Sequence, residues 1–234
     1  MPTKSPQGEG ELNFLDKLAR TTGRRTFLHW SGLTLAVVAL GCSDDDDGGT
    51  GPVTDVNLGS GDTGVLNYAY ALEQLEAAFY TQVVASFYAG ATADEQTILT
   101  DIRNHEVIHR DFLKAGLGAA AIADLTVDFT NVNFADRASV LGAARTFEDL
   151  GVSAYNGAGQ LLTTPANLVN AGRIVSVEAR HAAAIRDLLV PNSFAASDVV
   201  DSTGLDLVRS PAEVLPLADP YITTTINASG LPTA

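Results

Sequence analysis

The chain has 234 residues and a formal net charge of −14 at pH 7, a length that accommodates one hydrophobic core together with terminal extensions. Because so acidic a surface repels nucleic acid, we expect no nucleic-acid partner. Cys42 is the only cysteine, which excludes an intrachain disulfide and a metal site built from cysteines.

The first residues of the chain have the pattern of an export signal. Arg24-Arg25-Thr26-Phe27-Leu28 resembles a twin-arginine motif, and a mostly apolar run extends from Phe27 to Leu40. A run of about 14 residues is shorter than the roughly 20 that span a bilayer as a helix. The pattern therefore favours the apolar core of a signal peptide over a membrane anchor or a core helix.

A lipid attachment signal ends this segment. Ala39-Leu40-Gly41-Cys42 resembles a bacterial lipobox, in which the cysteine is lipidated and becomes the first residue of the mature chain. The position three residues before the cysteine holds Ala39, where leucine is preferred. We expect residues 1–42 to be a signal peptide. The exported protein would then lie on the periplasmic side of the cell envelope, anchored to the inner or the outer membrane through Cys42.

A linker is expected over residues 43–61. It contains four consecutive aspartates, several glycines and a proline. This composition cannot bury a core, so we predict an acidic, glycine-rich and disordered tether.

Apolar periodicity and capping signals predict four helices within residues 62–190. The predicted helices cover about residues 63–88, 92–116, 136–162 and 164–190. Thr92 and Glu95 form a capping box, Asp136 is a plausible N-cap, and Thr164 is an N-cap followed by Pro165 at the first helical position.

The lengths of the connections predict how these helices are arranged. The short links between the first two and the last two helices make each pair an antiparallel hairpin. Residues 117–135 could span about 60 Å, more than the roughly 38 Å length of a 25-residue helix, so they can cross the bundle from end to end. We predict an all-α four-helix bundle. An irregular tail, residues 191–234, would pack on it and hold one short helix capped by Ser210 and Glu213.

A repeated pattern lies on the predicted helices. Glu-x6-Tyr is followed about thirty residues later by Glu-x-x-His, and the two copies are Glu73, Tyr80, Glu106 and His109, then Glu148, Tyr155, Glu178 and His181. Counted from the hairpin turns, all four glutamates lie within roughly 3 Å of one level along the bundle.

Four carboxylates and two imidazoles at one level are the ligand set of a di-metal site in a helix bundle. The predicted ligands are Glu73, Glu106, His109, Glu148, Glu178 and His181. Each Glu-x-x-His pair lies on one helix face and binds one ion, and the two remaining glutamates bind terminally or bridge. Such mixed ligands suit iron or manganese better than zinc, and we expect two ions, with iron favoured.

Several residues close to the predicted ligands have more than one possible role. Glu76 competes with Glu73 as the ligand of the first helix, but only Glu73 has a tyrosine seven residues later, so Glu76 is expected at the surface or behind the ligands. Tyr80 and Tyr155 could donate hydrogen bonds to ligands or could be ordinary core aromatics. His105 is expected to point about 100° away from Glu106, which follows it, and not to be a ligand.

Three segments carry a resemblance to a known family. They are Leu72-Glu73-Gln74-Leu75-Glu76-Ala77-Ala78-Phe79-Tyr80, Phe147-Glu148-Asp149-Leu150-Gly151-Val152-Ser153-Ala154-Tyr155 and Glu178-Ala179-Arg180-His181-Ala182-Ala183. Over roughly residues 60–220 the chain resembles the bacterial ferritin-like domain family that includes desiccation-related proteins. The resemblance implies a ferritin-like bundle with a di-iron or di-manganese site, and it implies no particular reaction.

Two functions are compatible with these patterns. The first is redox chemistry with oxygen or hydrogen peroxide, as an oxidoreductase of ferroxidase or catalase type that uses no catalytic residue beyond the metal ligands. The second is a non-catalytic envelope protein, stress-protective or metal-sequestering, whose metal site is structural. The sequence indicates neither an electron partner nor an oligomeric state.

Overall fold

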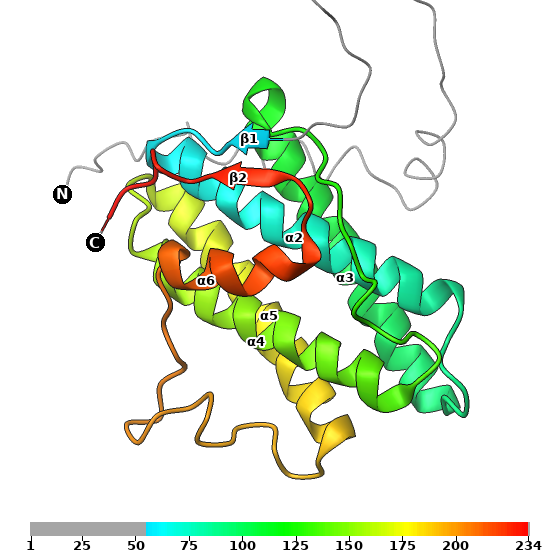
Figure 1. Ribbon diagram of the computed structural model, residues 1–234. Helices are drawn as coiled ribbons and strands as arrows, with labels where there is room; N and C mark the ends of the chain where they lie inside the picture. The colour runs from blue at the N-terminus through cyan, green and yellow to red at the C-terminus, as the bar shows by residue number, and fades with distance from the viewer. Residues whose placement is uncertain (1–54, 234) are drawn as a thin grey trace, which may run out of the picture. The chain divides into compact units, whose positions relative to one another are not determined.

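The structure is a computed structural model and describes residues 55–233. The expected signal peptide, Cys42 and most of the expected linker lie outside the described residues. Four long helices form a bundle (Figure 1), and they are α2 (Gly61–Ala85), α3 (Ala93–Leu117), α4 (Arg137–Gly159) and α5 (Pro165–Leu189). The predicted all-α fold is confirmed, and the predicted helices differ from the observed ones by up to three residues at their ends.

The helices pack as two hairpins. α2 packs mainly on α3, and α4 packs mainly on α5. The connection from α3 to α4 begins with a short 3-10 turn, η2 (Gly118–Ala120), and then runs along the bundle from one end to the other (Figure 1). Two antiparallel hairpins joined by one long crossover were predicted from loop lengths, and the structure has this topology.

Burial divides the helices into an inner and an outer pair. α2 and α4 are buried on most sides, whereas α3 and α5 each bury a single stripe facing the bundle interior. The stripe on α3 consists of Glu95, Leu99, Ile102, Glu106, His109 and Leu113. The stripe on α5 consists of Ile174, Glu178, His181, Ala182, Ile185 and Arg186. Both Glu-x-x-His pairs therefore lie on the inward faces of their helices.

No helix within residues 55–233 combines the length and the apolar composition needed to cross a membrane.

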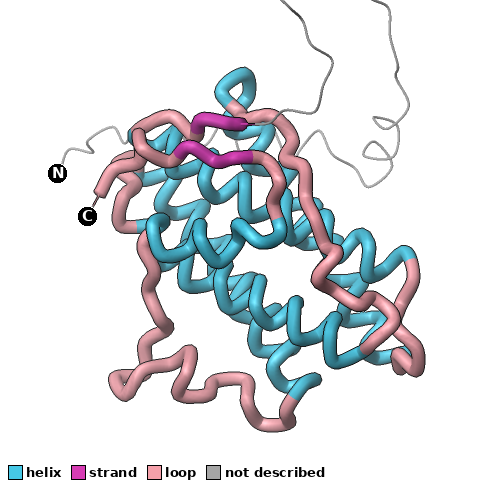
Figure 2. Tube along the Cα trace, in the orientation of Figure 1, coloured by secondary structure: helices cyan, strands magenta, loops and turns pink. Residues whose placement is uncertain are grey.

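A two-stranded parallel sheet joins the two ends of the described chain (Figure 2). β1 (Asp55–Asn57) pairs with β2 (Thr225–Asn227), with Val56 opposite Ile226. Val56 and Leu58 are buried. The expectation that the linker stays disordered as far as Gly61 is therefore wrong for its last residues, because they bury apolar side chains and complete a sheet.

The C-terminal tail covers the α4 side of the bundle. Its one α-helix, α6 (Pro211–Ala218), packs on α4 and begins with the predicted capping box of Ser210 and Glu213. A 3-10 turn, η3 (Asp219–Tyr221), leads from α6 toward β2.

Caps decide where the bundle helices begin. The capping box of Thr92 and Glu95 is present, and the Asp136 side chain accepts a hydrogen bond from the backbone N–H of Ser139. Thr164 occupies the N-cap of α5, but its side chain caps nothing.

Asp62, at the start of α2, binds the residues that lead into α5. Its carboxylate accepts hydrogen bonds from the backbone N–H of Thr163 at 2.8 Å, the N–H of Thr164 at 2.9 Å and the side-chain amide of Asn167 at 3.0 Å. A carboxylate from one hairpin thus binds the N-cap residue of a helix in the other, Thr164, together with the residue before it and the side chain of Asn167.

Candidate metal centre

All six predicted ligands point into the interior of the bundle. Every bundle helix contributes at least one: Glu73 from α2, Glu106 and His109 from α3, Glu148 from α4, Glu178 and His181 from α5. The four glutamates have no exposed surface, and the two histidines are 9% and 4% exposed. Their donor atoms form two groups, and within each group all atoms lie within 4.8 Å of one another.

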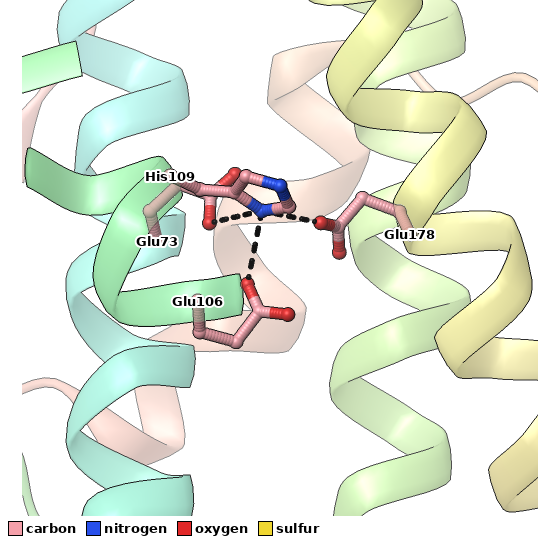
Figure 3. A group of neighbouring side chains, drawn as sticks. All are labelled: Glu73, Glu106, His109 and Glu178. Atoms are coloured by element: carbon pink, nitrogen blue, oxygen red, sulfur yellow. Dashed lines mark ion pairs between the residues drawn. The ribbon is translucent and has the colours of Figure 1, made fainter. Parts of the chain in front are cut away.

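The first group surrounds His109 (Figure 3). Its Nδ1 atom lies 2.9 Å from Oε1 of Glu178 and 3.5 Å from Oε2 of both Glu73 and Glu106. Carboxylates from three different helices therefore converge on one imidazole nitrogen.

The second group surrounds His181. Its Nδ1 atom lies 2.7 Å from Oε1 of Glu106 and 3.5 Å from Oε2 of Glu148. Glu178 completes this group, so Glu106 and Glu178 belong to both groups, whereas Glu73 and Glu148 belong to one each. Glu73 and Glu148 were expected to bind terminally or to bridge; if two ions bind here, Glu106 and Glu178 would be the glutamates within reach of both, and Glu73 and Glu148 would each be within reach of one.

The unpaired polar atoms of the site fit a cation. Both oxygens of Glu106 and of Glu178, and Nδ1 of both histidines, are buried without a hydrogen bond of good geometry. Their short contacts do not replace hydrogen bonds, because one N–H group cannot point at three carboxylates at once. A metal ion accepts several such donors together, and the carboxylate and imidazole set suits iron or manganese.

A family comparison agrees with the fold and the site. The model of the ferritin-like domain family matches residues 61–191, which are the four bundle helices and their connections. The chain belongs to the ferritin-like domain family. No curated protein matches it in sequence.

In the ferritin-like domain the buried glutamates are costly without a cation. Burial and the neighbouring Glu106 raise the pKa of Glu73 to about 8. Burial and the charges of Glu106 and Glu73 raise the pKa of Glu178 well above its usual range. These shifts mean that the surroundings disfavour the charged forms of Glu73 and Glu178 in the protein alone.

For the two histidines, in contrast, the surroundings favour the charged form. Burial lowers their pKa values, but the surrounding glutamates outweigh it and raise the pKa of His109 to about 12 and that of His181 to about 11. Burial likewise raises the pKa of Glu106, yet the two histidines bring it down to about 2. In the metal-free ferritin-like domain protons on the imidazoles therefore offset part of the carboxylate charge, and metal binding would displace them.

The two tyrosines of the repeat contact the predicted ligands. The Tyr80 hydroxyl donates to Oε1 of Glu148, and the Tyr155 hydroxyl donates to Oε1 of Glu73, both at 2.5 Å. Of the two interpretations of these tyrosines, the structure favours hydrogen bonds to ligands, since each bond leaves Oε2 of the same glutamate facing a histidine.

Glu76 lies beside the site, and the expectation that it could be a surface residue is wrong. It is 3% exposed, and burial followed by the charges of Glu178 and the other glutamates raises its pKa well above its usual range. Gly151 of α4 makes room for it, because a β-carbon there would lie 3.0 Å from Oε1 of Glu76 and 3.3 Å from Oε2 of Glu178. The spacing of Gly151, three residues after Glu148, was a signal for this role, because the two share a helix face.

His105 was not expected to be a ligand, and it belongs to neither ligand group, but it contacts a ligand of the other hairpin. Its Nδ1 atom lies 2.9 Å from Nε2 of His181. Sequence spacing missed this contact because His105 reaches His181 across the gap between two helices, α3 and α5.

Proposed function

We propose that this ferritin-like protein binds two ions of iron or manganese and reacts with oxygen or hydrogen peroxide at the cell envelope. The observation that carries the proposal is the pair of ligand groups that share Glu106 and Glu178. Two carboxylates common to both groups would hold two ions close together, as a two-electron reaction requires.

The metal pair, when bound, would exchange two electrons with oxygen or hydrogen peroxide, and the chain's own residues prepare the site for it. Four buried carboxylates offset the charge of the cations. Tyr80 and Tyr155 hold Glu148 and Glu73 in place through their hydroxyl groups. The almost complete burial of all six ligands excludes bulk water.

Composition supports chemistry with oxidants. Beyond Cys42 the chain contains no Met, Trp or Cys, the side chains that oxidants attack most readily. A protein that handles peroxide benefits from their absence around the reaction site.

The proposed location rests on the N-terminal sequence. The twin-arginine pattern at Arg24-Arg25 and the lipobox ending at Cys42 support export and a lipid anchor. Replacing both arginines with lysine should retain the protein in the cytoplasm, and Cys42→Ala should release it from the membrane fraction. Unchanged fractionation of both variants would contradict this location. The resemblance to desiccation-related proteins suggests that the protein acts during drying or oxidative stress.

A second function is favoured by the closure of the site. None of the four ligand glutamates has any exposed surface, which suits a metal pair that holds the hairpins together and does not turn over. In that case the protein would protect or sequester metal without catalysis.

Metal analysis of the purified protein separates the proposals. After anaerobic loading with Fe(II) or Mn(II), we expect two ions per chain by mass spectrometry, together with consumption of oxygen or hydrogen peroxide. Two ions without consumption would support the structural function, and fewer than one ion would overturn both.

A ligand variant and a matched control test the assignment of the site. Glu148→Gln should lose about half of the bound metal or more, because it removes a carboxylate from one of the two groups. Glu95→Gln changes a glutamate outside the site that is 5% exposed and binds Arg137 and the N-terminus of α3, and this variant should load fully.

A further inference from the structure

His105 and His181 form a direct hydrogen bond between rings. Nδ1 of His105 lies 2.9 Å from Nε2 of His181, and the two rings are 7° from parallel with their centroids 5.1 Å apart. Rings stacked face to face would not bring two nitrogens so close at that centroid distance. The rings are therefore nearly coplanar, and the bond lies in their common plane.

Metal binding would settle which nitrogen carries the proton. Nδ1 of His181 faces Glu106 and Glu148, so this is the atom that would bind an ion. A neutral imidazole that gives its Nδ1 lone pair to a metal keeps its proton on Nε2. His181 then donates from Nε2, and Nδ1 of His105 accepts.

The other half of the site lacks such a partner. Nδ1 of His109 faces three glutamates, whereas its Nε2 atom has no hydrogen-bond partner among residues 55–233. The position of the second copy that corresponds to His105 is Val177, which cannot accept a hydrogen bond. The two halves of an otherwise repeated site therefore differ in the support of their histidines.

We propose that His105 is a positioning residue that holds His181 in its metal-binding tautomer and orientation, and that it makes the half of the site around His181 the tighter of the two. A partner on the outer nitrogen of a ligand histidine fixes the ring and makes the metal-binding nitrogen more basic. His109 must instead become oriented when the ion arrives, which weakens its binding. This inference rests on the metal binding in the proposed function and extends it to an inequality between the two ions.

Three variants isolate the hydrogen bond. His105→Ala removes the acceptor, and because His105 lies on an exposed part of α3 the fold should tolerate the change. His105→Asn places an amide oxygen near the position of the Nδ1 acceptor and should restore the bond. Val177→Ala is the matched control at the equivalent position of the other copy. Thermal unfolding of the three metal-free variants checks that each one folds.

Binding of Co(II), followed by its absorption spectrum in competition with a chelator, provides the first measurement. The wild-type protein should bind two ions with different affinities. His105→Ala should weaken the tighter step by about 10- to 100-fold and leave the weaker step nearly unchanged. His105→Asn and Val177→Ala should resemble the wild type.

Nitrogen NMR of the Zn(II)-loaded protein provides a second measurement that does not depend on activity. The Nε2–H proton of His181 should be protected from exchange in the wild type and in His105→Asn. This protection should be lost in His105→Ala. Wild-type affinities in His105→Ala, equal weakening of both steps, or failure of His105→Asn to restore binding would each overturn the inference. A wild-type protein that binds fewer than two ions would instead overturn the metal pair, and this inference with it.

Discussion

Tyr155 of α4 donates its hydroxyl hydrogen bond to Glu73 of α2, and not to Glu148, which precedes it by seven residues on its own helix. Tyr80 of α2 makes the reciprocal bond to Glu148. The Glu-x6-Tyr repeat therefore describes a two-fold exchange between the inner helices. Each hairpin orients a glutamate of the other, so the site joins the two halves of the bundle even without metal.

Removing either hydroxyl should destabilise the metal-free protein. Tyr155→Phe or Tyr80→Phe leaves a buried carboxylate oxygen without its donor, and we expect a loss of about 1–3 kcal/mol in the free energy of unfolding, measured with urea. Tyr68→Phe is the matched control, because the Tyr68 hydroxyl is equally buried and has no hydrogen-bond partner. Equal losses in all three variants would mean that the crosswise bonds contribute nothing specific.

The metal-free protein should lose stability as the pH rises above about 6. The pKa of Glu73 is raised from 4.5 to about 8, so folding favours its protonated form and this stability is lost between those values. His109 and His181, raised from 6.5 to about 12 and about 11, contribute stability below pH 6.5 that is lost on further increase. All three effects have the same sign.

Thermal unfolding between pH 6 and pH 8, with and without Mn(II), measures this effect. The midpoint of the metal-free protein should fall over the range, whereas that of the loaded protein should fall less, because metal binding releases protons and tightens as the pH rises. In Glu73→Gln the unfolding midpoint of the metal-free protein should fall less steeply with pH. Parallel pH profiles for the free and loaded protein would contradict the prediction.

Gly151→Ala should impair metal binding while leaving the bundle folded. The new methyl group would lie 3.0 Å from Oε1 of Glu76 and 3.3 Å from Oε2 of Glu178, so these carboxylates must shift by a few tenths of an ångström. We expect a lower metal content at equal protein concentration, measured by mass spectrometry. Gly142→Ala is the control on the same helix. A β-carbon there meets nothing within 4 Å, and the change should preserve loading and add up to about 1 kcal/mol of stability.

Asp62→Ala should lower the thermal midpoint by removing the hydrogen bonds that hold the start of α5 to α2. Hydrogen bonds from Thr163, Thr164 and Asn167 hold the pKa of Asp62 well below its usual 3.8. The stabilisation is therefore present above pH 3.8 and is lost as the pH falls further. The difference in midpoint from the wild type should be largest near pH 7 and should shrink in acid.

Thr164→Ala tests whether the N-cap side chain of α5 contributes as well. Its side chain makes no capping hydrogen bond, so we expect a smaller change than for Asp62→Ala. A loss as large as that of Asp62→Ala would show that the helix depends on its own N-cap residue after all.

The sequence by itself determined the helices, their hairpin order and the candidate ligands. Capping boxes such as Thr92 with Glu95 depend on atoms a few residues apart, and so does the spacing from Glu106 to His109. Loop lengths restrict the connections in the same local way. These features follow from helix geometry and need no knowledge of the packing partner.

Only the tertiary structure decided which residues of different helices meet. Three contacts depend on how each helix is rotated about its axis and how closely it approaches its neighbour. They are the contact of His105 with His181, the burial of Glu76 over Gly151 and the hydrogen bonds of Asp62 to the start of α5. A shift of a few ångströms between α3 and α5 would separate the two histidines without changing any local signal. Rotation and spacing are set by the packing of the whole core, and for that reason short-range patterns did not predict them.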